Sequence, residues 1–133
     1  YVCCIYATAP LIQVDSIQKS YDLMQQEQAE YCFTATSFPF PIQRAIKIQA
    51  NKRLAMFYPE YFNTRSQDLE EAYHDAGQFY WGKSEAFLQE KPLFSEDAIP
   101  YLLPRNLVQD IDTLEDWEQA EFLFKLSQQK NDV

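Results

Sequence analysis

Two carboxylates separated by one residue, Asp110 and Asp112, form the pair of side chains best suited to chemistry in this sequence. Side chains at i and i+2 of an extended backbone project to the same side, so these carboxylates repel each other unless a cation lies between them. One or two carboxylates plus substrate phosphates typically hold Mg²⁺, which would neutralise charge on a transferring phosphoryl group. The spacing leaves an alternative open, in which Asp112 caps the following helix and Asp110 is solvated.

Other polar side chains could recognise an anion. Arg44 falls on the apolar face of an alternating segment, where a guanidinium needs an anion, such as a sugar carboxylate, or a set of carbonyl groups. An Arg that reaches solvent at a sheet edge or pairs with an acidic neighbour is the alternative. Arg65 lies in a polar loop with Gln67 and Asp68, and such loops often carry ligands, although a solvated surface has the same composition. The single histidine, His74, is more typical of a structural role than of a catalytic base.

Glycine is scarce in the sequence, which contains only Gly77 and Gly82. Loops that cradle phosphates bring backbone amides close to the ligand, and this approach usually requires glycine. We therefore expect no triphosphate-binding loop of that type within these 133 residues.

The composition indicates a folded, acidic protein. A length of 133 residues suggests one domain, 1–133, and an apolar fraction of 47% supplies a core. The net charge of −9 repels nucleic-acid phosphates, so we expect no nucleic-acid partner. No apolar stretch approaches the roughly 20 residues of a membrane span, and the first residues lack a signal-peptide pattern. We expect no membrane association and a cytoplasmic location.

Alternating strands and helices would position these side chains. The apolar run 1–6 predicts a strand buried on both faces, a helix follows from Asp15, and 31–38 predicts a second strand. Strand–loop–helix units of this kind are the building blocks of α/β folds. Because a strand buried on both faces normally lies inside a sheet, the opening run predicts that this sequence is part of a longer fold.

The middle and the end of the sequence predict a hairpin and a final helix. Residues 42–49 alternate between apolar and polar, and 54–58 could return antiparallel, which gives a hairpin over about 42–58. An isolated hairpin is marginally stable in water, so we expect it to pack against another surface, such as a second subunit. Thr113 predicts the cap of the last helix. The predicted buried stripe of that helix consists of Leu114, Trp117, Ala120 and Phe124.

Several stretches of the sequence together resemble pseudaminic acid cytidylyltransferases, which belong with the CMP-sialic acid synthetases to a wider family. They are IYATAP at 5–10, FPFPIQRA at 38–45, RSQDLEEAYHDAGQFYWG at 65–82, and QDIDT at 109–113 followed by Asp116-Trp117 and Ala120-Glu121. The matches run in family order from residue 1 to about residue 125. The stretches are specific as a set, although no single one would be.

The resemblance implies a fold and a reaction. The fold would be a Rossmann-like α/β nucleotidyltransferase sheet with flanking helices, a nucleotide site at the strand C-termini and a β-hairpin extension that forms a homodimer. The reaction would be attack of the anomeric hydroxyl of a nonulosonic acid, with pseudaminic acid favoured, on the α-phosphate of CTP. Its products would be the CMP-sugar and pyrophosphate, and Mg²⁺ would be required.

The resemblance also implies roles for individual residues. Asp110 and Asp112 match the catalytic, metal-binding aspartates of the family, and Thr8 and Ala9 lie in the loop that contacts nucleotide and sugar. Tyr6 stands where the sialic branch usually carries Gln, which favours the pseudaminic branch. Four further residues fall in or beside the expected sugar pocket: Gln43, Arg44, Arg65 and Gln78.

The front part of the family pattern has no counterpart in this sequence. Family members begin with a strand and a basic, glycine-rich loop that holds the CTP phosphates. We therefore expect the C-terminal portion of a cytidylyltransferase, inactive or nearly so on its own. The alternative is a folded, non-catalytic interaction module, for example a homodimer built on the hairpin at 42–58.

Overall fold

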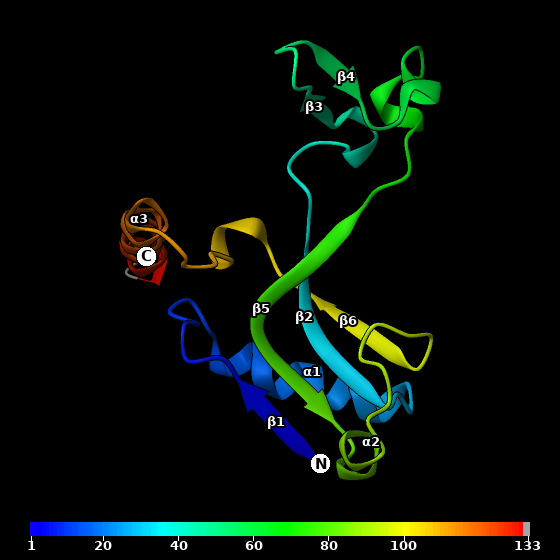
Figure 1. The fold of residues 1–133 in the computed structure, drawn as a ribbon. Coiled ribbons are helices and arrows are strands. Elements are labelled where there is room, and N and C mark those ends of the chain that lie inside the picture. Colours follow the sequence, from blue (N-terminus) through cyan, green and yellow to red (C-terminus); the bar gives the residue numbers. More distant parts are fainter. Residues whose placement is uncertain (132–133) are drawn as a thin grey trace. The chain divides into compact units, whose positions relative to one another are not determined.

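The computed structural model describes residues 1–131 and has the alternating strands and helices of an α/β protein. Figure 1 shows the elements, which are β1 Val2–Ile5, α1 Val14–Gln26, β2 Tyr31–Ser37, β3 Ile46–Ile48, β4 Leu54–Met56, β5 Tyr73–Gly82, α2 Ser84–Leu88, β6 Ala98–Leu102 and α3 Leu114–Asn131. The chain divides into two compact units, Ser37–His74 and the remainder on either side of it. The α/β class predicted from the sequence is confirmed, whereas the single domain over 1–133 stays a prediction.

A four-stranded mixed sheet in the order β1-β5-β2-β6 forms the framework of the larger unit. Strand β1 pairs antiparallel with β5, and β2 pairs parallel with β6. Helix α1 packs on the sheet. The indole nitrogen of Trp81, in β5, donates a hydrogen bond to the carbonyl of Ile17, in α1, at 3.0 Å. The ring of Tyr21 also lies 5.0 Å from that of Trp81. A mixed sheet with flanking helices is consistent with the predicted Rossmann-like architecture.

The core lies around β2, whose first six residues are all buried. On one face of the sheet, the rings of Tyr31 and Phe33 contact Phe87 and Phe94 at 5.1 and 5.3 Å between centroids. This packing needs a glycine at the end of β5. A Cβ on Gly82 would lie 2.7 Å from the Tyr31 ring and 2.5 Å from the Phe87 ring, distances that real Cβ atoms do not adopt.

The apolar sequence of β1 predicts a strand inside a sheet, but among the described residues β1 does not lie inside one. It is an edge strand, paired with β5, and three of its four residues are exposed. The apolar run still suits a strand covered on both faces. For the described chain, the prediction that β1 is buried on both faces was wrong. The apolar pattern indicates the surroundings that would suit this strand, but the described residues supply a partner strand on one side of it only.

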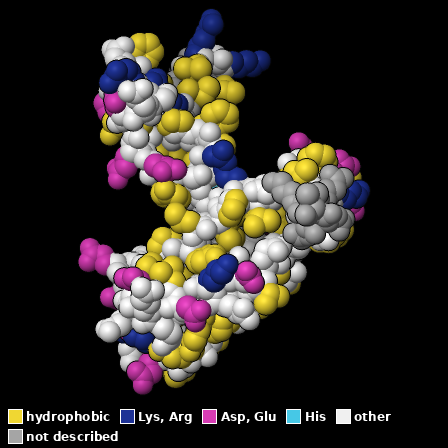
Figure 2. Space-filling view, turned by 180° about the vertical axis from the view of Figure 1, so that it is seen from behind, with side chains coloured by type: hydrophobic (Ala, Val, Ile, Leu, Met, Phe, Trp, Pro, Cys, Tyr) yellow, Lys and Arg dark blue, Asp and Glu magenta, His cyan; other side chains and the backbone are white. Residues whose placement is uncertain are grey.

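The hairpin of the smaller unit is shorter than predicted. Ile42–Arg44 forms a 3-10 turn after Pro41, and only Ile46–Ile48 pairs with Leu54–Met56. A continuous strand over 42–49 is therefore wrong, because the amide of Ala45 bonds back to the carbonyl of Ile42 at 3.0 Å. The apolar side chains of the hairpin are exposed, up to 80% for Ile48. Figure 2, a view of one face, shows hydrophobic side chains (yellow) at the surface.

Helix α3 begins after Thr113, as predicted, but its apolar stripe is not buried. Of the predicted stripe only Ala120 is buried, whereas Leu114, Trp117 and Phe124 are exposed. Two loop residues, Pro10 and Ile111, line a groove together with Trp117, Ala120 and Phe124 of this helix. Across residues 1–131, no helix combines the length and the apolar character needed to cross a bilayer.

Candidate functional site

The two aspartates lie in a segment without regular secondary structure, between a 3-10 turn, Arg105–Leu107, and α3, with Asp112 in a bend. Asp110 and Asp112 are exposed, and Ile111 between them is half-buried. The Ile111 side chain lines an apolar groove of about 260 Å³ together with Pro10 and Trp117. The residues that precede α3 therefore present both carboxylates to solvent.

The N-terminus of α3 is capped by Thr113 and Asp116. The hydroxyl oxygen of Thr113 accepts the amide of Asp116 at 3.2 Å, and Oδ2 of Asp116 accepts the amide and the hydroxyl of Thr113 at 2.8 and 2.7 Å. The same oxygen accepts the amide of Asp112. These hydrogen bonds, the Thr113 hydroxyl foremost, hold the pKa of Asp116 below its ordinary value. The carboxylate of Asp112 is thus not the cap.

Carboxylate oxygens of the kind that Asp110 and Asp112 carry are ligands that Mg²⁺ prefers, and a metal ion at this pair stays a prediction. Oδ1 of Asp110 accepts a hydrogen bond from the amide of Ile111 at 3.1 Å, and Oδ2 of Asp110 takes no part in this bond. Within residues 1–131, no group of three or more His, Cys, Asp or Glu side chains is arranged to hold a metal ion.

The loop after β1 carries Thr8 and Ala9 and is held from both ends. The amide of Tyr6 donates to the carbonyl of Gln78 at 2.9 Å, and the amide of Ile12 donates to the carbonyl of Ala9 at 3.3 Å. Thr8 is exposed in the turn between these bonds, and Ala9 is half-buried. The Thr8 hydroxyl is therefore presented beyond the carboxyl end of β1, where open α/β sheets bind ligands.

Gln78 connects this loop to the segment that precedes the aspartates. Its side chain is only 3% exposed, and its Nε2 donates to the carbonyl of Leu107 at 2.5 Å. Its backbone carbonyl meanwhile accepts the amide of Tyr6. One residue of β5 thus ties together the two loops that hold Thr8 and Asp110. Direct contact of Gln78 with a substrate stays a prediction.

The other predicted site residues belong to the smaller unit, Ser37–His74, where two of them stabilise loops. The guanidinium of Arg44 donates to the carbonyls of Phe62, at 3.2 Å, and Thr64. Carbonyl groups thus satisfy this charge, which is one of the two possibilities foreseen from the sequence. The amide nitrogen of the buried Gln43 donates to the carbonyl of Glu70 at 3.1 Å.

Arg65 differs from these two residues because it is exposed. It pairs through Nε with Oδ2 of Asp68 at 2.8 Å, with side chains 74% and 45% exposed. Such an exposed pair is weak, so a ligand carboxylate could compete for the guanidinium. The roles of Gln43, Arg44 and Arg65 in binding stay predictions.

The sequence did not reveal a set of hydrogen bonds around Gly77 in β5. Gly77 has a φ of +63°, and its amide donates to Oδ1 of Asp75 at 2.8 Å, while the Tyr80 hydroxyl donates to Oδ2 at 2.5 Å. Burial and the hydrogen bond to Asp75 raise the pKa of Tyr80, and the ring of Tyr6 lies 5.1 Å from that of Tyr80. The sequence signal that could have indicated this irregularity of β5 is the isolated glycine, Gly77, within a strand pattern.

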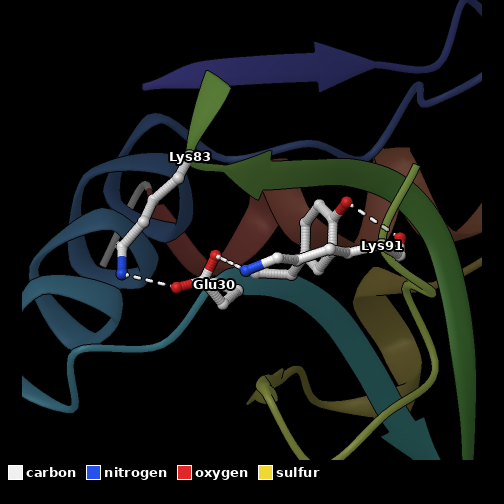
Figure 3. A network of polar contacts seen from close by, with 4 residues as sticks. Glu30, Lys83 and Lys91 are labelled. Atoms are coloured by element: carbon white, nitrogen blue, oxygen red, sulfur yellow. Dashed lines mark hydrogen bonds and ion pairs between the residues drawn. The ribbon is translucent and has the colours of Figure 1, made fainter. Parts of the chain in front are cut away.

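A second polar network ties the ends of β2, β5 and the segment after α2. Figure 3 shows the carboxylate of Glu30 between the ammonium groups of Lys83 and Lys91, at 2.9 and 3.0 Å. The hydroxyl of Tyr31 donates to the carbonyl of Lys91 at 3.0 Å. The hydrogen bonds from Lys83 and Lys91 hold the pKa of Glu30 below its ordinary value. We assign this network to stability, because the carboxylate of Glu30 pairs with both ammonium groups.

Comparison with known proteins gives three significant relatives, although no protein-family model matches the sequence. A pseudaminic acid cytidylyltransferase of Campylobacter jejuni serotype O:2 is 46% identical over 127 residues, which is 96% of this chain and 55% of that protein. A second protein of that name, from serotype O:23/36, gives the same identity and coverage. A Helicobacter pylori protein named pseudaminic acid cytidylyltransferase and UDP-2,4-diacetamido-2,4,6-trideoxy-beta-L-altropyranose hydrolase is 34% identical over 82% of this chain and 21% of its own length.

The chain spans about half the length of the two Campylobacter proteins. Within that half the match runs through 127 of the 133 residues, so it includes the two loops joined by Gln78 as well as the smaller unit. The resemblance predicted from the motifs is thereby confirmed: over almost its whole length, this chain is a homologue of pseudaminic acid cytidylyltransferases, matched to about half of their length.

Proposed function

We propose that residues 1–133 are the C-terminal, sugar- and metal-binding portion of a cytidylyltransferase that transfers CMP from CTP to pseudaminic acid. The observation that carries this proposal is the 46% identity, over 96% of the chain, to proteins named for that activity. The position of Thr8 and Asp110 on two loops that one buried residue, Gln78, holds together through its side chain and its backbone carbonyl supports it. A nucleotide-sugar enzyme of this kind would act in the cytoplasm, where CTP is available.

The two loops of the larger unit would act on the phosphates. Asp110 and Asp112 would hold Mg²⁺, which when bound neutralises charge on the phosphate oxygens. The exposed hydroxyl of Thr8 would hydrogen-bond the nucleotide or the sugar, beside Ala9. Gln78 would preserve the spacing of the loops, so that groups bound to either one meet in a fixed geometry.

The smaller unit would bind the carboxylate of the sugar. Arg65 is the best candidate, because its exposed ion pair with Asp68 is easily replaced by a ligand. Arg44 would shape the loop that precedes Arg65 through its bonds to the carbonyls of Phe62 and Thr64. Gln43 would do the same for the segment at Glu70.

We further propose that the 133-residue chain alone does not catalyse the transfer. The two glycines of the sequence lie in β5, where Gly77 has a positive φ and Gly82 packs against rings. Neither belongs to a loop that could enclose a triphosphate. The chain would therefore bind sugar and metal but lack the means to position CTP.

The test combines binding and turnover with the 133-residue chain. Calorimetry should detect binding of pseudaminic acid to the chain. The affinity of the chain for Mg²⁺ should fall strongly in the variants Asp110→Asn and Asp112→Asn, but not in the exposed control Glu115→Gln. Turnover with CTP, Mg²⁺ and pseudaminic acid should be undetectable. A rate in the ordinary range of ~1–10³ s⁻¹ would overturn the proposed inactivity. Failure to bind pseudaminic acid at millimolar concentration would overturn the proposed site.

A second candidate function is that of a non-catalytic homodimer formed through β3 and β4. The exposed apolar side chains of this hairpin favour it, since a two-stranded hairpin needs further packing for stability. Sedimentation should show dimers that Ile48→Asp dissociates, while Leu88→Asp, an equally exposed site on α2, has no effect. Monomers alone at high concentration would contradict this candidate.

A further inference from the structure

The carboxylate of Asp116 makes more hydrogen bonds than the cap of α3 requires. In a capping box, the acidic side chain of the first turn returns to the amide of the cap residue, which here is Thr113, at 2.8 Å. Oδ2 of Asp116 also accepts a hydrogen bond from the amide of Asp112 at 3.2 Å, and Oδ1 accepts one from Nε2 of Gln109 at 3.3 Å. Both additional donors belong to the segment before the helix, so this carboxylate holds that segment as well as the helix start.

Gln109 extends this connection to Asp110. Its Nε2 donates to the carbonyl of Asp110 at 2.9 Å as well as to Oδ1 of Asp116. The nitrogen of a side-chain amide carries two protons, so both hydrogen bonds can exist at once. Asp112 is thus tied to Asp116 through its own backbone amide, and Asp110 is tied to it through the side chain of Gln109.

The same hydrogen bonds indicate which role Asp116 can have. Its Oδ2 accepts three of them, from the amides of Asp112 and Thr113 and from the Thr113 hydroxyl, and the residue is half-buried. Asp110 and Asp112, in contrast, are exposed. Asp116 is therefore suited to orient its neighbours, whereas the two exposed aspartates are suited to contact a ligand.

We propose that Gln109 and Asp116 are positioning residues that fix the backbone on both sides of Ile111, so that the carboxylates of Asp110 and Asp112 are held in one arrangement before a ligand binds. This inference rests on the proposed function, because it concerns the same pair of aspartates. Order that already exists in the free chain does not have to be created on binding, which increases affinity. Loss of these hydrogen bonds should therefore weaken the binding of a cation that neither Gln109 nor Asp116 touches.

The test measures the affinity of the 133-residue chain for Mg²⁺ alone by calorimetry. Gln109→Leu removes the connection to Asp110 but keeps the bonds between Thr113 and Asp116, and it should weaken binding by about three- to tenfold. Asp116→Asn should weaken it by at least about tenfold, because a side-chain amide accepts hydrogen bonds on one side only. Glu115→Gln removes one negative charge from the same turn and is the control, which should keep most of the affinity. Unchanged affinity in Gln109→Leu would overturn the inference and leave the proposed function intact.

A measurement without metal separates positioning from helix capping. In nuclear magnetic resonance relaxation, the backbone of 110–112 should be as ordered as α3 in the wild type and more mobile in Gln109→Leu, while the first turn of α3 is unchanged. Equal mobility of 110–112 in the two chains would refute the positioning role, whatever the affinity for Mg²⁺. Ordered aspartates in a wild type that binds no Mg²⁺ at millimolar concentration would overturn the proposed metal site and this inference together.

Discussion

The larger unit and the segment Ser37–His74 are stabilised by different kinds of interaction. The larger unit has an apolar core, in which Phe79 and Tyr31 are almost inaccessible to solvent. Among the described residues of the smaller unit, the one buried side chain is Gln43, an amide. Its loops are held by hydrogen bonds from Gln43 and Arg44 to backbone carbonyls. The smaller unit thus has directional bonds where the larger one has apolar packing.

This difference teaches which region can be stable alone. Burial of apolar surface is the dominant favourable term in folding, and net contributions of single hydrogen bonds are modest. We therefore expect the larger unit to retain its structure without a partner. The smaller unit, whose apolar side chains are exposed, should gain stability when a second surface covers them.

The largest expected effect compares the same substitution in both regions. Phe79→Ala removes a fully buried ring and should lower the free energy of unfolding by about 3–5 kcal/mol. Phe62→Ala, at an exposed ring of the smaller unit, should change it by about 0.5 kcal/mol or less. Urea unfolding measures both, with the 133-residue chain at low concentration. Equal costs would refute the contrast between the units.

The next effect tests whether polar bonds replace a core in the smaller unit. Arg44→Met removes the donors to the carbonyls of Phe62 and Thr64 and should cost about 1–3 kcal/mol locally. Amide exchange should accelerate over 59–65, while β2 is unaffected. Arg53→Met, at an exposed site in the same unit, serves as control. Unchanged exchange over 59–65 would mean that the bonds of Arg44 are dispensable.

A smaller effect concerns α3, which resembles the smaller unit because its apolar residues are exposed. Thr113→Ala removes the cap and should destabilise the start of the helix by about 1 kcal/mol, whereas Thr113→Ser should restore it. Hydrogen exchange in the first turn of α3 is the measurement. If alanine and serine behaved alike, the hydroxyl of Thr113 would not be the stabilising group.

The smallest effect is expected for Glu30, whose ion pairs add to the stability of a unit that already has an apolar core. Its pKa is lowered in the folded protein by Lys83 and Lys91. It therefore stabilises the fold above its ordinary pKa of 4.5, and this contribution is lost as the pH falls below that value. Glu30→Gln should lower the Tm at pH 7 by a few degrees, with a gap that narrows in acid. The exposed control Glu96→Gln should show no such gap.

The sequence predicted local features well and long-range ones poorly. The helix start at Thr113 follows from capping chemistry within four residues, and the hairpin follows from alternation, although Pro41 and the 3-10 turn shortened it. The edge position of β1 depends on which strands pair with it, a property absent from the run itself. Tyr80 and Asp75 make contact across Gly77, whose positive φ departs from regular strand geometry, so simple alternation could not reveal this contact.

The bonds of Gln78 have a thermodynamic consequence. Since this residue holds the loop of Thr8 through its backbone and the segment before Asp110 through its side chain, a molecule that orders one loop also restrains the other. Occupation of either loop should raise the affinity at its neighbour, and by linkage the enhancement is identical in both directions. Sugar and cation would then assist each other's binding without touching.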